Sequence, residues 1–135
     1  MRRVQVESPS FPAVPLDALL DAGVGQLWQV LCGDEGHWRL GLYSPELTRA
    51  HDCVELERHT CPELFLLLSG KVSLVLAEGG RLRSLALEVG RPALITAPHS
   101  GFCPEGAHTG VALVLERDVF ETEYRSAQEW LSEGP

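Results

Sequence analysis

Residues 57–72 read Glu57-Arg58-His59-Thr60-Cys61-Pro62-Glu63-Leu64-Phe65-Leu66-Leu67-Leu68-Ser69-Gly70-Lys71-Val72, a polar start followed by an apolar run that stops at a Ser-Gly turn. In an extended chain, side chains of one parity point to one face. Glu57, His59 and Glu63 would then share a face with Phe65 and Leu67. The ionisable groups lie at one end of this face and the core residues at the other. A metal or ligand site at the mouth of a small β-barrel requires this arrangement.

The composition bounds the class of protein. At 135 residues the chain is predicted to form one domain, long enough to bury about two-thirds of its unfolded surface. The formal net charge of -8 argues against binding to nucleic acid and to an anionic membrane surface. We see no signal-peptide pattern and no apolar run approaching the roughly 18 residues that a membrane span needs. These features predict a cytoplasmic protein.

Short strands separated by turn signals dominate the chain. Turn sequences such as Gly33-Asp34-Glu35-Gly36, Ser69-Gly70 and Glu78-Gly79-Gly80 recur between apolar segments. This pattern predicts an all-β barrel or two packed sheets. The predicted strands cover residues 26–32, 38–44, 50–56, 63–68, 71–77, 81–87, 93–96 and 110–116.

The sequence divides into three predicted segments. Residues 1–25 form an N-terminal arm with a short helix at 15–23, and residues 26–117 form the barrel. Residues 118–135 form a C-terminal helix packed on the barrel. Asp118 and Glu121 have the spacing of a capping box at the start of that helix.

The segment from Glu57 to Gly70 resembles the first motif of the cupin superfamily. That motif has two histidines one residue apart, then a glutamate, six residues and a glycine. Glu63, the six following residues and Gly70 match its second half, and His59 stands at the second histidine. Glu57 replaces the first histidine, and His51 stands where a glycine is expected.

Gly90, Pro98 and Gly101 resemble the second cupin motif, which ends in a further histidine. Anchoring the motif on Gly90 puts Gly101 at the histidine position, whereas anchoring it on Pro98 puts Cys103 there. His99 and Cys103 share parity with Gly101, so either is a candidate ligand.

The resemblance implies a small single-domain cupin, a jelly-roll barrel (double-stranded β-helix) that commonly forms homodimers. It also implies a metal or ligand site inside the barrel. Imidazole and carboxylate donors suit a divalent metal such as iron, manganese, nickel or zinc, and a cysteine thiolate would favour zinc or iron. The candidate metal ligands are Glu57, His59, Glu63, His99 and Cys103.

Three functions remain open on the sequence. The first is a metal-dependent enzyme acting on a small molecule, in which a glutamate that is not a ligand moves a proton. The second is a metal-free binding module, or an isomerase with His59 as its base. If the protein is an enzyme, His59 and Glu63 are the candidate catalytic residues. The third is an interaction protein whose site no longer functions. No Gly-x-Ser-x-Gly nucleophile motif is present.

Two sets of residues are predicted to be structural. Trp28 and Trp38 alternate with polar residues in predicted strands, which is more typical of core or dimer-interface residues than of a substrate-binding surface. The cysteines lack the spacing of a metal or redox motif and are predicted to be free thiols: Cys32, Cys53, Cys61 and Cys103.

Overall fold

The apolar run after Glu63 forms a strand, β4 (Glu63–Ser69), in the computed structural model, which describes residues 1–3, 5 and 25–133. Glu63, Phe65 and Leu67 are buried along β4. The strand ends at Gly70, whose φ of +66° lies in the left-handed region that favours glycine. The predicted position of this strand and of its turn is therefore confirmed.

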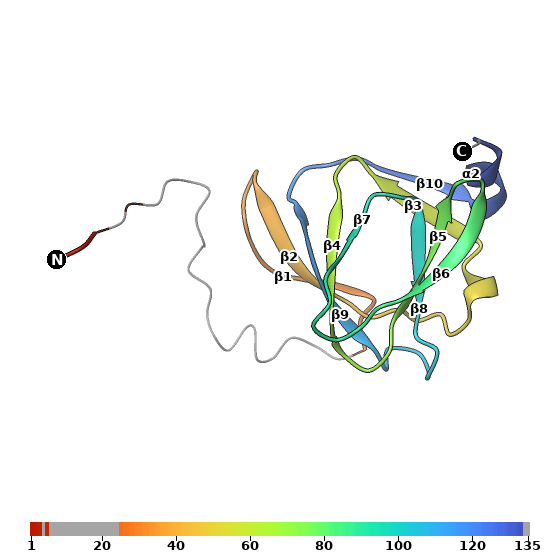
Figure 1. Ribbon diagram of the computed structural model, residues 1–135, viewed down its shortest axis with the longest axis horizontal. Coiled ribbons are helices and arrows are strands. Elements are labelled where there is room, and N and C mark those ends of the chain that lie inside the picture. The colour runs from red at the N-terminus through yellow and green to blue at the C-terminus, as the bar shows by residue number, and fades with distance from the viewer. Residues whose placement is uncertain (4, 6–24, 134–135) are drawn as a thin grey trace.

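Within the described residues, ten strands form two five-stranded antiparallel sheets that face each other (Figure 1). One sheet has the order β1-β2-β9-β4-β7 and the other β10-β3-β8-β5-β6. The remaining strands are β1 (Trp28–Asp34), β2 (Trp38–Tyr43), β3 (Glu55–His59), β5 (Ser73–Glu78), β6 (Arg81–Ala86), β7 (Ala93–Ile95), β8 (His99–Phe102), β9 (Val111–Arg117) and β10 (Thr122–Ser126). This arrangement confirms the predicted all-β jelly-roll fold.

The core lies between the two sheets because each strand turns alternate side chains inward. Its main cluster includes Phe65 and Leu67 from β4, Leu74 from β5 and Val114 from β9. A second cluster brings Leu56 and Val75 together with Trp130, which donates a hydrogen bond of 2.9 Å from Nε1 to the Leu56 carbonyl oxygen. The apolar interior leaves one end of the barrel for polar side chains.

The C-terminal helix begins later than predicted. Residues 122–126 form β10, which pairs with β3, and the helix α2 spans Ala127–Ser132. The capping box is made by Ser126 and Glu129, each side chain bonding the other's backbone N–H. Asp118 and Glu121 have the same spacing but begin no helix, because the residues after them form a strand that hydrogen-bonds to β3.

Two other predictions differ from the structure. Residues 50–52 form a short 3-10 helix, so the third predicted strand begins only at Glu55. The segment 99–102, predicted as a loop because of its proline and glycine content, forms β8. The helix predicted at 15–23 lies outside the described residues. None of the described helices has the length and apolar character needed to cross a bilayer.

Candidate metal centre

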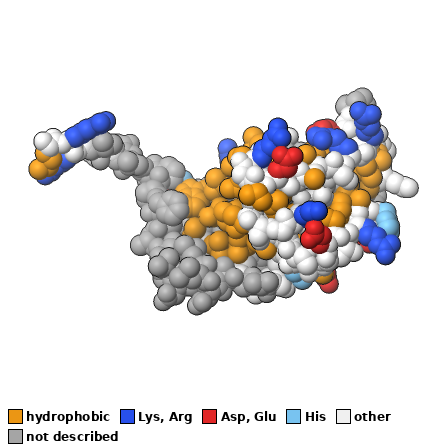
Figure 2. Space-filling view, turned by 60° about the horizontal axis from the view of Figure 1, so that its bottom comes forward, with side chains coloured by type: hydrophobic (Ala, Val, Ile, Leu, Met, Phe, Trp, Pro, Cys, Tyr) orange, Lys and Arg blue, Asp and Glu red, His pale blue; other side chains and the backbone are white. Residues whose placement is uncertain are grey.

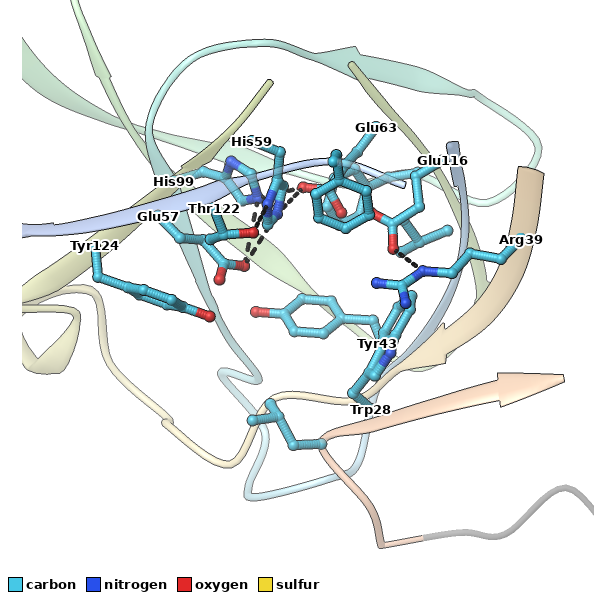
Figure 3. Close-up of a pocket in the computed structure, with 14 residues that line it drawn as sticks. Trp28, Arg39, Tyr43, Glu57, His59, Glu63, His99, Glu116, Thr122 and Tyr124 are labelled. Carbon is cyan, nitrogen blue, oxygen red and sulfur yellow. Dashed lines mark hydrogen bonds and ion pairs between the residues drawn. The ribbon is translucent and has the colours of Figure 1, made fainter. Parts of the chain in front are cut away.

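Four side chains that can bind a metal ion cluster at one end of the barrel, where three strands meet (Figure 3). Glu57 and His59 lie on β3, Glu63 begins β4, and His99 begins β8. Register places Glu57 directly opposite His99 in the β3–β8 pair. The turn at residues 60–62 then carries the chain from one sheet to the other, which brings Glu63 to face the two histidines.

The donor atoms of these four residues converge. Oε1 of Glu63 lies 2.8 Å from Nε2 of His59 and 2.9 Å from Nε2 of His99. Oε1 of Glu57 is farther, at 3.6 Å and 3.8 Å from the same two nitrogens. One donor atom from each residue lies within 4.8 Å of the others. A single small cation placed among them would reach all four.

The other ring nitrogen of each histidine is held by a partner. Nδ1 of His99 donates to the Ala97 carbonyl oxygen at 2.9 Å, because a carbonyl can only accept. Nδ1 of His59 lies 2.7 Å from the Thr122 hydroxyl, which β10 positions opposite it. In the neutral His99 ring Nε2 therefore presents its lone pair to the cluster, as metal-binding histidines do.

Glu63 Oε1 supplies the clearest sign that the cluster fits a cation. It is buried, and a neutral His99 ring, whose Nε2 carries only a lone pair, offers it no hydrogen bond at 2.9 Å. A buried carboxylate oxygen without such a bond is costly. A metal ion between the oxygen and the two nitrogens would remove that cost.

In the metal-free cluster, the two imidazoles are protonated and the Glu63 carboxylate is ionised. Burial lowers the pKa of His59, but hydrogen bonds and charge from Glu57 and Glu63 outweigh it and raise that pKa to about 10. The pKa of His99 is raised against its burial by Glu63. Burial raises the pKa of Glu63, yet the two histidines lower it to about 2. Protons on the imidazoles therefore balance the carboxylates when no metal does.

A third glutamate, Glu116, lies beside Glu63. Glu116 on β9 is buried, and its Oε1 accepts a hydrogen bond of 2.8 Å from Nε of Arg39 on β2. Burial and the neighbouring Glu63 carboxylate raise the pKa of Glu116 to about 7, against the opposing effect of Arg39. The site thus holds a third carboxyl group that does not belong to the four clustered donors.

A cavity of about 250 Å³ lies beside the cluster, and aromatic side chains form part of its wall. Trp28, Tyr43 and Phe120 all line it. Two glycines make room for these rings: a Cβ at Gly41 would overlap the Trp28 indole, and a Cβ at Gly101 would overlap the Tyr43 phenol. The cavity is small, since ligand pockets commonly measure about 300–1,000 Å³.

The structure places four of the five predicted ligands together, and Cys103 apart. Cys103 is fully buried in the apolar core, with Sγ 3.6 Å from the Gly110 carbonyl oxygen. Cys103 keeps the inward parity of His99 and Gly101, but it lies four residues farther along the chain, in the apolar core and not in the cluster. Of the two second-motif candidates, His99 is the one in the cluster. The four cysteines are free thiols, as predicted.

Several site residues were missed by the sequence analysis. Glu116 shares inward parity with Ala112 and Val114 on its strand, a signal that was available. Arg39 pairs with Glu116 across the β2–β9 register, which a single sequence does not reveal. Trp28, interpreted above as a core or interface residue, packs against the main core cluster and also lines the cavity.

Comparisons with known proteins agree with this fold. No family model and no curated protein sequence matches the chain. Solved structures do. A cupin-2 domain protein from Shewanella frigidimarina is similar over 75% of this chain and 89% of that chain, with a TM-score of 0.54 and 14% identity. A putative sugar phosphate isomerase from Acidithiobacillus ferrooxidans is similar over 75% and 70%, with a TM-score of 0.51 and 20% identity.

The structure of FeII HppE is similar over 67% of this chain and 48% of that chain, with a TM-score of 0.53 and 12% identity. Identities this low establish the architecture and nothing about the reaction. The chain has the cupin fold, as the first motif indicates, with a 2-histidine, 2-glutamate cluster at the end of its barrel.

Proposed function

We propose that this protein binds one divalent transition metal through His59, His99 and Glu63, with Glu57 as a fourth, more exposed ligand. The metal would hold a small-molecule substrate or ligand in the adjoining cavity. The observation that carries this proposal is the convergence of two Nε2 atoms on the buried oxygen Oε1 of Glu63. Nitrogen and oxygen donors of this kind suit iron, manganese, nickel or zinc.

The chain's own residues have separate roles in this proposal. Ala97 and Thr122 hold the Nδ1 atoms and so fix both imidazole rings. Glu57, with a side chain 30% exposed, is the donor nearest to solvent and marks the side from which a ligand enters. A bound metal would act as a Lewis acid on a ligand oxygen, and the buried wall would exclude water around it.

The metal-free alternative is an isomerase with His59 as its base, and the likeness to a putative sugar phosphate isomerase supports it. A base must be unprotonated when it acts. Glu57 and Glu63 hold the pKa of His59 at about 10, so the metal-free ring is an imidazolium at neutral pH. The metal-binding proposal is therefore the stronger of the two.

Metal titration at several pH values tests this proposal. We expect one metal ion per chain, released by a chelator, and binding that strengthens from pH 6 to pH 8. The sign follows from the raised pKa values of His59 and His99, because the metal must displace protons from both rings. Calorimetry in buffers of different ionisation enthalpy should show net proton release. Absence of stoichiometric binding of iron, manganese, nickel and zinc would contradict the proposal.

We also propose that two copies of the chain associate through the outer face of the β1-β2-β9-β4-β7 sheet. Leucines occupy that face on the central strands, paired across the register as Leu40 with Leu115, Leu42 with Leu113, and Leu66 with Leu113. Hydrophobic side chains gather over this part of the molecule (Figure 2). Apolar patches of this kind mark association surfaces.

The predicted cytoplasmic location and the predicted lack of nucleic-acid binding remain proposals that rest on composition.

Replacing Leu113 by glutamate should convert a dimer to a monomer in sedimentation velocity experiments, because it places a charge at the centre of the leucine face. Leu82→Glu is the matched control, since Leu82 is 42% exposed on β6 of the opposite sheet. A wild-type protein that sediments as a monomer at micromolar concentration would contradict the dimer.

A further inference from the structure

Arg39 is the only arginine or lysine among the described residues that line the cavity beside the metal cluster. Its guanidinium carbon lies 5.6 Å from the centre of the Trp28 ring and 4.9 Å from the centre of the Phe120 ring. Stacking on aromatic rings fixes the plane of a guanidinium group. Gly41 keeps the Trp28 indole in place by leaving room for it. Arg39 is therefore positioned by its neighbours and not merely exposed.

Only one edge of this guanidinium is used within the described part of the chain. Nε donates to Glu116, and neither Nη1 nor Nη2 hydrogen-bonds to another described residue. Figure 3 shows these two nitrogens on the cavity side of the Arg39–Glu116 contact. The Arg39 side chain is 27% exposed, so a group in the cavity can reach them.

From this geometry we infer that the cavity takes a small, planar monocarboxylate, whose anionic group is held by Nη1 and Nη2 of Arg39. The inference deepens the proposed function, because it names the ligand class of the same site. A guanidinium fork matches the two oxygens of a carboxylate and binds them bidentately. The flat rings of Trp28, Phe120 and Tyr43 provide apolar faces for the rest of the ligand.

Charge and size favour a monoanion. Glu57 and Glu63 would offset the charge of a bound divalent ion, and Arg39, paired with Glu116 through Nε alone, remains the group that can meet an anion. A phosphate dianion would add two negative charges beside three carboxyl groups, whereas a carboxylate adds one. A cationic ligand would meet Arg39 directly. The volume of about 250 Å³ accommodates a ring the size of benzoate.

The test is calorimetric binding of benzoate, benzamide and inorganic phosphate to zinc-loaded protein. Benzoate should bind about tenfold or more tightly than its neutral isostere benzamide, and more tightly than phosphate. Arg39→Lys should weaken benzoate binding by about tenfold or more, because lysine keeps the charge beside Glu116 but lacks the planar fork. Arg83→Lys, which alters an exposed arginine paired with Glu78, should leave benzoate binding unchanged.

The outcomes separate this inference from the metal proposal. If zinc binds stoichiometrically but Arg39→Lys binds benzoate as the wild type does, the ligand assignment is overturned and the metal site stands. If zinc does not bind, yet benzoate binds the metal-free protein with the same dependence on Arg39, the metal site falls and the ligand assignment stands. Tighter binding of phosphate or benzamide than of benzoate, or no benzoate binding, overturns the ligand assignment.

Discussion

Replacing Glu63 by glutamine should weaken metal binding by on the order of 100-fold or more. The substitution keeps the size of the side chain but removes the anionic charge that both imidazoles face at 2.8 Å and 2.9 Å. The amide NH2 group of glutamine can also donate a hydrogen bond to the Nε2 lone pairs, which then cannot bind a metal ion. Equilibrium dialysis or competition with a chromophoric chelator measures the change, and circular dichroism checks that the fold persists.

Glu116→Gln is the control for this prediction. Glu116 is equally buried at 5% exposure and lies beside Glu63, but it is not one of the four converging donors. Its substitution should change metal affinity far less than Glu63→Gln does. Equal losses in the two variants would mean that the buried charge matters in general and that Glu63 is not a ligand. Wild-type affinity in Glu63→Gln would refute its role outright.

The second large effect is expected at the turn after β4. Gly70 has a φ of +66°, and a Cβ there would overlap the Thr109 carbonyl oxygen and lie against Gly110. Gly70→Ala therefore combines a left-handed backbone with a clash against backbone atoms of Thr109 and Gly110, which lead into β9. We expect a loss of about 3–5 kcal/mol in the free energy of unfolding, measured by urea denaturation.

Gly79→Ala provides the comparison. Gly79 has nearly the same backbone conformation, with a φ of +63°, but a Cβ there meets nothing within 4 Å. Its cost should be the conformational part alone, about 1–2 kcal/mol. If the two variants lose the same stability, close packing at Gly70 is not the reason for glycine at the end of the first motif.

The sequence predicted the core of the site, although by an incomplete argument. Strand alternation placed Glu57, His59 and Glu63 on one face of a single extended segment. In the structure, β3 and β4 belong to different sheets, and the turn between them makes their inner faces converge. The three side chains converge because both strands present the same parity to one interior.

The remaining parts of the site depend on contacts between distant segments. Pro98 and Gly101 are typical of a loop, yet Gly101 lies in β8, where it pairs with Leu74 of β5 and the Tyr43 ring occupies the space of a side chain. Arg39 and Glu116 meet only through the β2–β9 register. The late start of α2 likewise follows from pairing between β10 and β3. Local propensity does not carry this information.

The most direct measurement of the central claim is X-ray absorption spectroscopy of the protein loaded with one equivalent of zinc. The account predicts a first shell of nitrogen and oxygen at about 2.0–2.2 Å, with the outer-shell scattering of two imidazole rings. The second imidazole signal should disappear in His99→Ala. A sulfur scatterer at about 2.3 Å, or a first shell without histidine, would contradict the assignment of His59, His99 and Glu63 as the ligands.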